Sequence, residues 1–212
     1  MKKRTWLLFV VMGFVSACST GGFQAGTDVQ SGRLAFSIGN YQMARSYFAQ
    51  AAQVDPNYVY NSDLPGGSIQ SYLGRADYET KRYASARKLL QQAVAINKND
   101  NVARLYLGLT MAQMGDKENG LKEIQAGLKG LYDWIEYVRK NFSAGNEYGQ
   151  FWDQNGTIRA AIQVDLNMIA SGQIDWPKLL ADGASIGKQM DNEINVAQTD
   201  QRIVVTESIG GR

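Results

Sequence analysis

The sequence predicts an all-α protein: a short array of about three helical hairpins, a capping helix, and extra C-terminal helices. Two segments, 42 positions apart, show the same sequence of residue types: an aromatic, a small, a large apolar and a second small residue. They are Tyr41, Ala44, Phe48 and Ala51 in the first segment, and Tyr83, Ala86, Leu90 and Ala93 in the second. A glycine precedes each set, at Gly32 and Gly74, and Gly108 follows in a 34-residue register. Such spacing places each set on one face of a helix.

The composition limits the possible chemistry. The chain has 212 residues, of which 44% are hydrophobic, so it can form a buried core. It contains no histidine and one cysteine. These counts exclude histidine acid–base catalysis, Cys–His nucleophiles, His/Cys zinc sites and an intrachain disulfide. We therefore expect a protein that is not an enzyme and that uses no metal or cofactor.

The first residues have the pattern of a bacterial export signal. Basic residues at positions 2–4 precede an apolar run from Trp6 to Val15, which is too short to span a bilayer comfortably. Residues 15–18, Val-Ser-Ala-Cys, resemble the lipobox of bacterial lipoproteins. The resemblance implies that residues 1–17 are removed and that Cys18 carries the lipid. The alternative is an ordinary signal peptide with an incidental thiol.

This resemblance has consequences for charge and location. Removal of three basic residues changes the net charge from +2 to −1, which leaves no electrostatic footprint for nucleic acid. A lipid would anchor the chain to a membrane without spanning it. Ser19 stands where inner-membrane retention would favour aspartate, so the resemblance implies the outer membrane, facing the periplasm. Residues 18–27 are glycine-rich and predict a flexible tether.

We assign residues 28–143 to the hairpin array with its capping helix. Asp28 is a candidate cap of the first helix, and the Gly39–Asn40 turn leads into a second helix over Tyr41–Val54. Pro56 ends that helix. The 42-residue spacing then implies a loop insertion of about eight residues before Ser68, either a tolerated surface loop or part of a binding face.

The second hairpin, about Gly67 to Asp100, is the most complete, and the third follows it by 34 residues. Glycines at positions 120 and 127 replace the small alanines of the earlier hairpins, at a cost of about 1 kcal/mol each in helix propensity. The chain is expected to continue as a helix over Leu131–Phe142, and its apolar side is interpreted as a cap that covers the last hairpin.

The repeated pattern resembles the tetratricopeptide repeat, over about Ala25 to Tyr132. The resemblance implies stacked helix pairs that bind proteins and expose their first helices on a concave groove. By that resemblance the groove carries five candidate partner-binding residues: Arg33, Phe36, Arg75, Tyr78 and Glu79. Arginine pairs would suit an acidic or C-terminal peptide, whereas the alternative is that these residues are solvated.

Residues 144–200 predict a C-terminal helical element that resembles no family we recognise. One helix is expected over Thr157–Ala170, and a second starts with Asp175 as its cap. Asp191 and Glu193 are interpreted as a solvated face of that second helix. Residues 153–156, Asp-Gln-Asn-Gly, open like a calcium loop but lack its later acidic ligands, so a helix-initiating turn is favoured. Residues 201–212 predict a frayed tail.

These observations predict a non-catalytic scaffold or adaptor lipoprotein that binds protein partners at the bacterial cell envelope. The alternative is a ligand-binding module with a pocket for a small molecule or glycan, lined by Tyr72, Tyr106 and Trp134. An enzyme is disfavoured because histidine and a second cysteine are missing.

Overall fold

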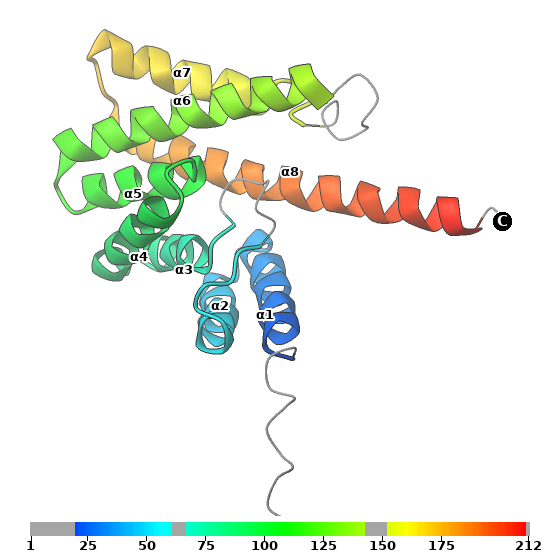
Figure 1. The fold of residues 1–212 in the computed structure, drawn as a ribbon. Coiled ribbons are helices and arrows are strands. Elements are labelled where there is room, and N and C mark those ends of the chain that lie inside the picture. The colour runs from blue at the N-terminus through cyan, green and yellow to red at the C-terminus, as the bar shows by residue number, and fades with distance from the viewer. Residues whose placement is uncertain (1–19, 61–66, 143–151, 211–212) are drawn as a thin grey trace, which may run out of the picture.

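A computed structural model describes residues 20–60, 67–142 and 152–210, with side chains described over 22–60, 67–141 and 152–195. The described residues form eight α-helices (Figure 1). Their bounds are α1 Thr20–Ser37, α2 Tyr41–Val54, α3 Ile69–Glu79, α4 Tyr83–Ile96, α5 Asn101–Gln113, α6 Lys117–Phe142, α7 Thr157–Ser171 and α8 Trp176–Gly210. The only β pairing among them is an isolated bridge between Val59 and Ser68. The prediction of an all-α fold is confirmed.

Three hairpins, α1–α2, α3–α4 and α5–α6, stack in sequence order (Figure 1). In each hairpin the predicted glycine lies where the two helices cross. A Cβ atom added at Gly32 would lie 2.4 Å from the Phe48 ring, and one at Gly74 would lie 2.6 Å from Leu90 Cγ. A Cβ at Gly108 would lie 2.5 Å from the backbone nitrogen of Ile124. The repeat register predicted from the sequence therefore corresponds to the same crossing in all three hairpins.

Short polar side chains begin several of these helices. The backbone N–H of Met43 donates to Asn40 Oδ1 at 3.2 Å, and that of Ser71 donates to the Ser68 hydroxyl at 3.2 Å. The first helix of the third hairpin begins similarly, since Ala103 N–H donates to Asp100 Oδ1 at 2.8 Å. Each bond satisfies a backbone donor that would otherwise lack a partner at the helix start.

The start of α1 differs from the prediction. The helix begins at Thr20, inside the segment 18–27 that we expected to be a tether, and Ala25 has no exposed surface. Burial of Ala25 in the core of the first hairpin explains why this glycine-rich segment is helical. Asp28 is not a cap. It lies within α1 and accepts hydrogen bonds from Gln24 Nε2 at 3.2 Å.

The predicted capping helix, Leu131–Phe142, is the second half of α6. Helix α6 runs without a break from Lys117 to Phe142. Glycines inside it do not end the helix because they lie against α5: a Cβ at Gly127 would approach the Leu105 backbone to 2.7 Å, and one at Gly130 would overlap Asn101. Close packing against α5 stabilises the helix where propensity alone would weaken it.

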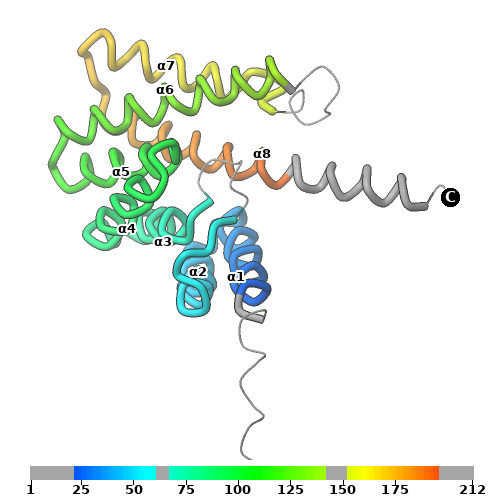
Figure 2. The backbone as a smooth tube through the Cα atoms, viewed as in Figure 1, coloured from blue at the N-terminus to red at the C-terminus, as the bar shows by residue number. Residues whose placement is uncertain are grey.

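Two further helices complete the molecule. Helix α7 packs against α6, and α8 packs against α5 and α7 and reaches α1 (Figure 2). Asp175 begins α8 as predicted, accepting from the backbone N–H of Lys178 at 3.1 Å. The backbone of α8 is helical to Gly210, so the segment 201–210 that we expected to fray is part of this helix.

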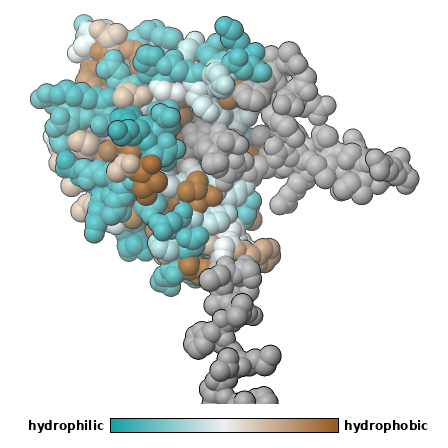
Figure 3. Space-filling view, in the orientation of Figure 1, coloured by the Kyte–Doolittle hydropathy of each residue, from teal (hydrophilic) through white to brown (hydrophobic). Residues whose placement is uncertain are grey.

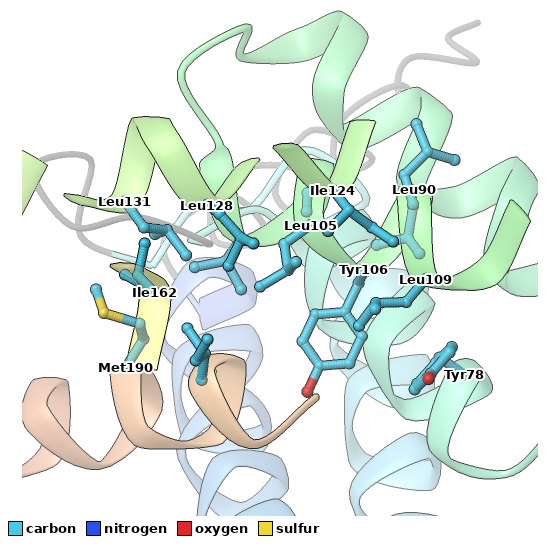
Figure 4. Packing of buried hydrophobic residues seen from close by; sticks show 14 of the residues in the cluster. Tyr78, Leu90, Leu105, Tyr106, Leu109, Ile124, Leu128, Leu131, Ile162 and Met190 are labelled. Atoms are coloured by element: carbon cyan, nitrogen blue, oxygen red, sulfur yellow. The ribbon is translucent and has the colours of Figure 1, made fainter. Parts of the chain in front are cut away.

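The buried hydrophobic residues form two clusters. The smaller joins α1, α2 and α3 around Phe48. The larger joins α4 to α8, and Figure 4 shows Leu128 and Leu131 of α6 near Ile162 of α7 and Met190 of α8. Helices α7 and α8 therefore share the core of the last two hairpins. None of the helices in the described part of the chain is long and apolar enough to cross a membrane.

Candidate functional site

The best-defined polar contact between the array and α8 joins Arg75, in the middle of α3, to Asp191. The arginine side chain is 2% exposed, and its Nη1 donates to both carboxylate oxygens of Asp191 at 2.8 Å. The guanidinium lies 4.7 Å from the centre of the Tyr72 ring. Burial acts to lower the pKa of Arg75, but the Asp191 carboxylate and the hydroxyls of Tyr72 and Tyr106 leave that pKa above its ordinary value.

Arg33, on α1, makes the equivalent contact one hairpin earlier. Its Nη2 donates to the side-chain oxygen of Asn195 at 2.6 Å, and its guanidinium lies 4.4 Å from the centre of the Tyr60 ring. Arginine suits both contacts because its planar group stacks on an aromatic ring while its N–H groups point outward.

A third contact lies at the end of α3. Lys188 Nζ of α8 is 3.2 Å from Glu79 Oε2 and 5.1 Å from the centre of the Tyr41 ring. Burial acts to lower the pKa of Lys188, and the neighbouring Tyr41 and Glu79 raise it above its ordinary value. Tyr78 packs edge-on against Tyr106, with ring centres 5.3 Å apart.

Two glycines let α8 approach α5 closely. A Cβ atom at Gly187 would lie 2.4 Å from Tyr106 Cε2, and one at Gly183 would lie 2.9 Å from Leu109 Cδ2. The two positions are four residues apart and so lie on one face of the helix. Figure 4 shows Tyr106 and Leu109 side by side on the face of α5 where α8 passes.

Helix α8 thus contacts the first helix of every hairpin. Moving along α8, Gly183 and Gly187 meet α5, Lys188 and Asp191 meet α3, and Asn195 meets α1. The first helices of the array form one surface that holds a single helix across three hairpins.

The five residues predicted to line an open groove do lie together, but they are covered. Exposed fractions are 4% for Arg33, 6% for Phe36, 2% for Arg75 and 8% for Tyr78, and the side chain of Glu79 is 11% exposed. The expectation of an open groove is therefore wrong, because α8 occupies it.

Sequence reasoning also misjudged the residues that occupy the groove. Asp191 was interpreted as part of a solvated face, yet it is buried against Arg75. A signal was present in the glycines at 183 and 187 and the polar residues at 188, 191 and 195, which share one helical face. Glu193 lies partly buried near the backbone N–H of Asp153, at 3.4 Å.

Little space remains between α8 and the array. The cavity bordered by Arg33, Tyr72, Arg75 and Asn195 has a volume of about 10 Å³, which is the size of one water molecule. Tyr72 is stacked on Phe48 with ring centres 4.9 Å apart. This packing does not favour the alternative of a ligand pocket around the buried tyrosines.

Asp153 lies just before α7, and its hydrogen bonds are those of a helix-initiating turn and not of a calcium loop. Its carboxylate accepts from the backbone N–H groups of Ile158 at 2.8 Å and Arg159 at 3.1 Å, and from Arg159 Nε at 2.8 Å. Within the described ranges no cluster of three acidic or cysteine side chains could hold a metal ion. Cys18, the predicted lipid attachment residue, lies outside the described residues.

Comparison with known proteins shows which kind of repeat the hairpins resemble. Residues 23–99 match the family model described as "Tetratricopeptide repeat". The first two hairpins are thus similar to tetratricopeptide repeats. The third hairpin lies beyond the tetratricopeptide match but keeps the same glycine crossing at Gly108. The match begins at residue 23, upstream of Asp28, where we expected the first helix to start. This agrees with the structure, in which α1 begins at Thr20.

The chain is also similar to human "Tetratricopeptide repeat protein 13", with 29% identity over 84 residues. The similar segment is 40% of this chain and 9% of that protein, so the likeness concerns the repeats alone. No solved structure gives a significant match. Tetratricopeptide repeats generally mediate protein–protein interaction, and they are not a catalytic type of repeat.

Proposed function

We propose that this tetratricopeptide protein is a non-catalytic scaffold that binds protein partners at the bacterial cell envelope. One observation carries the proposal: residues 23–99 match the tetratricopeptide repeat, which generally mediates protein–protein interaction. The chain itself shows that these repeats can hold a helix by charge and shape, since Arg33 of α1, Arg75 of α3 and Tyr106 of α5 all contact α8.

In this proposal the concave surface is used within the chain. Helix α8 buries Leu179, Ile186 and Met190 in the larger core, each with no exposed surface. Burial of one such side chain stabilises the fold by about 1.5–3 kcal/mol, so a partner would not readily displace α8. The partner therefore binds the outer surface of the array. Figure 3 shows hydrophobic residues scattered over one face of that surface among hydrophilic ones.

The proposal includes a lipid anchor at Cys18 and a place on the outer membrane, facing the periplasm. Two sequence features support it: the lipobox-like residues 15–18 and Ser19 in the sorting position. Because α1 begins at Thr20, only Ser19 separates the anchor from the folded array. The array would then lie close to the membrane surface.

Membrane fractionation tests the anchor. Cys18→Ala should release the protein from the membrane or leave it unprocessed, whereas Ser19→Asp should move it from the outer to the inner membrane. Unchanged fractionation of Cys18→Ala would show that the protein is not held by a lipid on this residue. The Ser19→Asp variant serves as a control because it keeps the cysteine.

Photo-crosslinking in the native envelope tests the scaffold. A photoreactive residue is placed at Ile96 or Met114, which are 59% and 44% exposed on the array, and at Val164, which is 52% exposed on α7. We expect a discrete adduct with another protein from an array position and none from Val164. The proposal fails if no array position gives an adduct, or if all three give the same mixture.

A further inference from the structure

One face of α1, which carries Thr27, Gln30 and Leu34 and is called its outward face, corresponds to a face that is buried in the other two hairpins. Shifting Thr27, Gln30 and Leu34 by 42 residues gives Ile69, Tyr72 and Ala76 of α3, which are at most 2% exposed. A further shift of 34 residues gives Ala103, Tyr106 and Thr110 of α5, none of which has exposed surface. In α3 and α5 the preceding hairpin covers this face, as the stacking of Phe48 on Tyr72 illustrates.

In α1 the same face is open. Thr27 and Gln30 are exposed, and Leu34 is 66% exposed. Phe23 lies on the same side of α1 and is 80% exposed, and Ile38, which follows the last residue of α1 and bonds back to Leu34, is 71% exposed. Figure 1 shows α1 at the end of the stack, with no hairpin of the described residues beyond it.

The outward face of α1 is also uncharged. The charged residues of α1 are Asp28 and Arg33, and both are buried, at 7% and 4% exposed. A terminal repeat in contact with water normally carries a polar cap, and surface helices usually place charges outward. Depletion of charge around exposed apolar residues is instead typical of the core of a protein interface.

The opposite end of the array is closed. Helices α7 and α8 pack against α6 and α5, and Ile158 and Ile162 of α7 lie in the same core as Leu131 and Ile135 of α6. Head-to-tail stacking of copies would need both ends of the array open. The only repeat-stacking face left open for a second copy among the described helices is therefore that of α1.

We propose that the outward face of α1 joins two copies of this chain head-to-head, with α1 packed against α1 about a two-fold axis. A two-fold interface brings the same residues together from both copies, so an uncharged face can meet itself without like-charge repulsion. The side-chain amides of Gln24 and Gln30 donate to Asp28 and to the Tyr60 hydroxyl within the chain, so we expect the apolar side chains to make the contact. A bilayer is the less suitable occupant, since helices that lie on membranes expose lysine or arginine, and α1 exposes neither. The proposal does not depend on the lipid anchor or on a partner.

The test is the mass of the processed protein, extracted from its native envelope in mild detergent and measured by sedimentation with correction for bound detergent. We expect a dimer. The double variant Leu34→Arg/Ile38→Arg places four guanidinium groups at the interface and should weaken self-association at least about 100-fold, giving a monomer. Helical circular dichroism should stay unchanged, because both side chains are exposed in the monomer.

The matched control is Ile96→Arg, which changes a side chain of the same type that is 59% exposed on α4. This variant should remain dimeric. A monomeric wild-type protein, or a dimer that persists in the double variant, would overturn the proposal. A photoreactive residue at Leu34 gives an independent readout: an adduct with the same chain supports the proposal, and an adduct with a different protein or with lipid refutes it.

Discussion

Arg75 and Asp191 are 116 positions apart in the sequence, yet Nη1 of the arginine lies 2.8 Å from both oxygens of the aspartate. The contact joins the middle of the repeat array to the C-terminal helix. Arg75 is the residue of the concave surface best suited to bind a carboxylate of a partner. Because it already binds Asp191 of the same chain, it is not free to do so.

The first prediction concerns this pair. Arg75→Met leaves the buried Asp191 carboxylate without its partner, and we expect the free energy of unfolding to fall by about 3–5 kcal/mol. Arg75→Met combined with Asp191→Leu removes both charges and should recover most of that loss. Urea denaturation followed by circular dichroism measures both variants.

An exposed ion pair provides the control. Glu118 and Lys122 lie 2.8 Å apart on the surface of α6, with side chains 84% and 66% exposed. Glu118→Gln should cause no measurable loss, because water screens the pair. If Arg75→Met is as stable as Glu118→Gln, the contact between α3 and α8 does not hold the two parts together.

The second prediction concerns the close approach of α8 to α5. Gly187→Ala would place a methyl group 2.4 Å from the buried Tyr106 ring and should destabilise the protein by roughly 1–3 kcal/mol. Gly22→Ala is the matched control: nothing lies within 4 Å of a Cβ there, and the change should stabilise α1 slightly. Thermal melts of both variants test this, and equal melting temperatures would contradict the close packing.

The third prediction concerns pH. Asp165 of α7 has no exposed surface, and neither carboxylate oxygen has a hydrogen-bond partner within the described part of the chain. Burial, with the nearby Asp182 carboxylate, raises the pKa of Asp165 to about 7. The folded state therefore keeps this proton after the unfolded state has lost it, so stability should fall as the pH rises from about 4 to about 7.

Asp165→Asn should remove this fall and make the protein more stable than the wild type at pH 8, by up to about 4 kcal/mol at about 1.4 kcal/mol per unit of pKa shift. At pH 4 the two proteins should be similar, because Asp165 is then protonated in the folded state and about half protonated in the unfolded state, so little stability has yet been lost. Asp133→Asn, which changes a side chain that is 58% exposed on α6, serves as the control and should keep the wild-type pH profile. A wild-type profile for Asp165→Asn would show that this carboxyl does not titrate in the range.

The fourth prediction concerns the start of α7. Asp153→Ala removes the acceptor for two backbone N–H groups and for Arg159 Nε, and should destabilise the protein by about 1–2 kcal/mol. Asp153→Asn keeps an acceptor and tolerates the positive φ of 45°, so it should lose less. Calcium should leave the melting temperature unchanged, since the carboxylate is already occupied. A rise with calcium in the wild type that Asp153→Ala abolishes would instead indicate a metal site.

The sequence predicted the helix pairs well because their signals are local. The aromatic and small residues of α2 recur in α4, and the bounds expected for α2, Tyr41 and Val54, are those observed. The sequence failed at Asp28 and at the start of α1, where burial of Ala25 extends the helix beyond the apparent cap. Inside α6 the sequence predicted glycines on the helix at a cost in propensity, and close contact with α5 explains why the helix persists there.

The sequence by itself determined that the protein is a stack of helical hairpins and which residues lie at each crossing, because periodicity and glycine spacing act over one or two helices. It also placed Arg33, Phe36, Arg75, Tyr78 and Glu79 on one surface. Only the tertiary structure decided that α8 covers this surface. Its lysine, aspartate and asparagine meet partners on α1 and α3 that are distant in sequence, and no local propensity encodes which helix fills a groove.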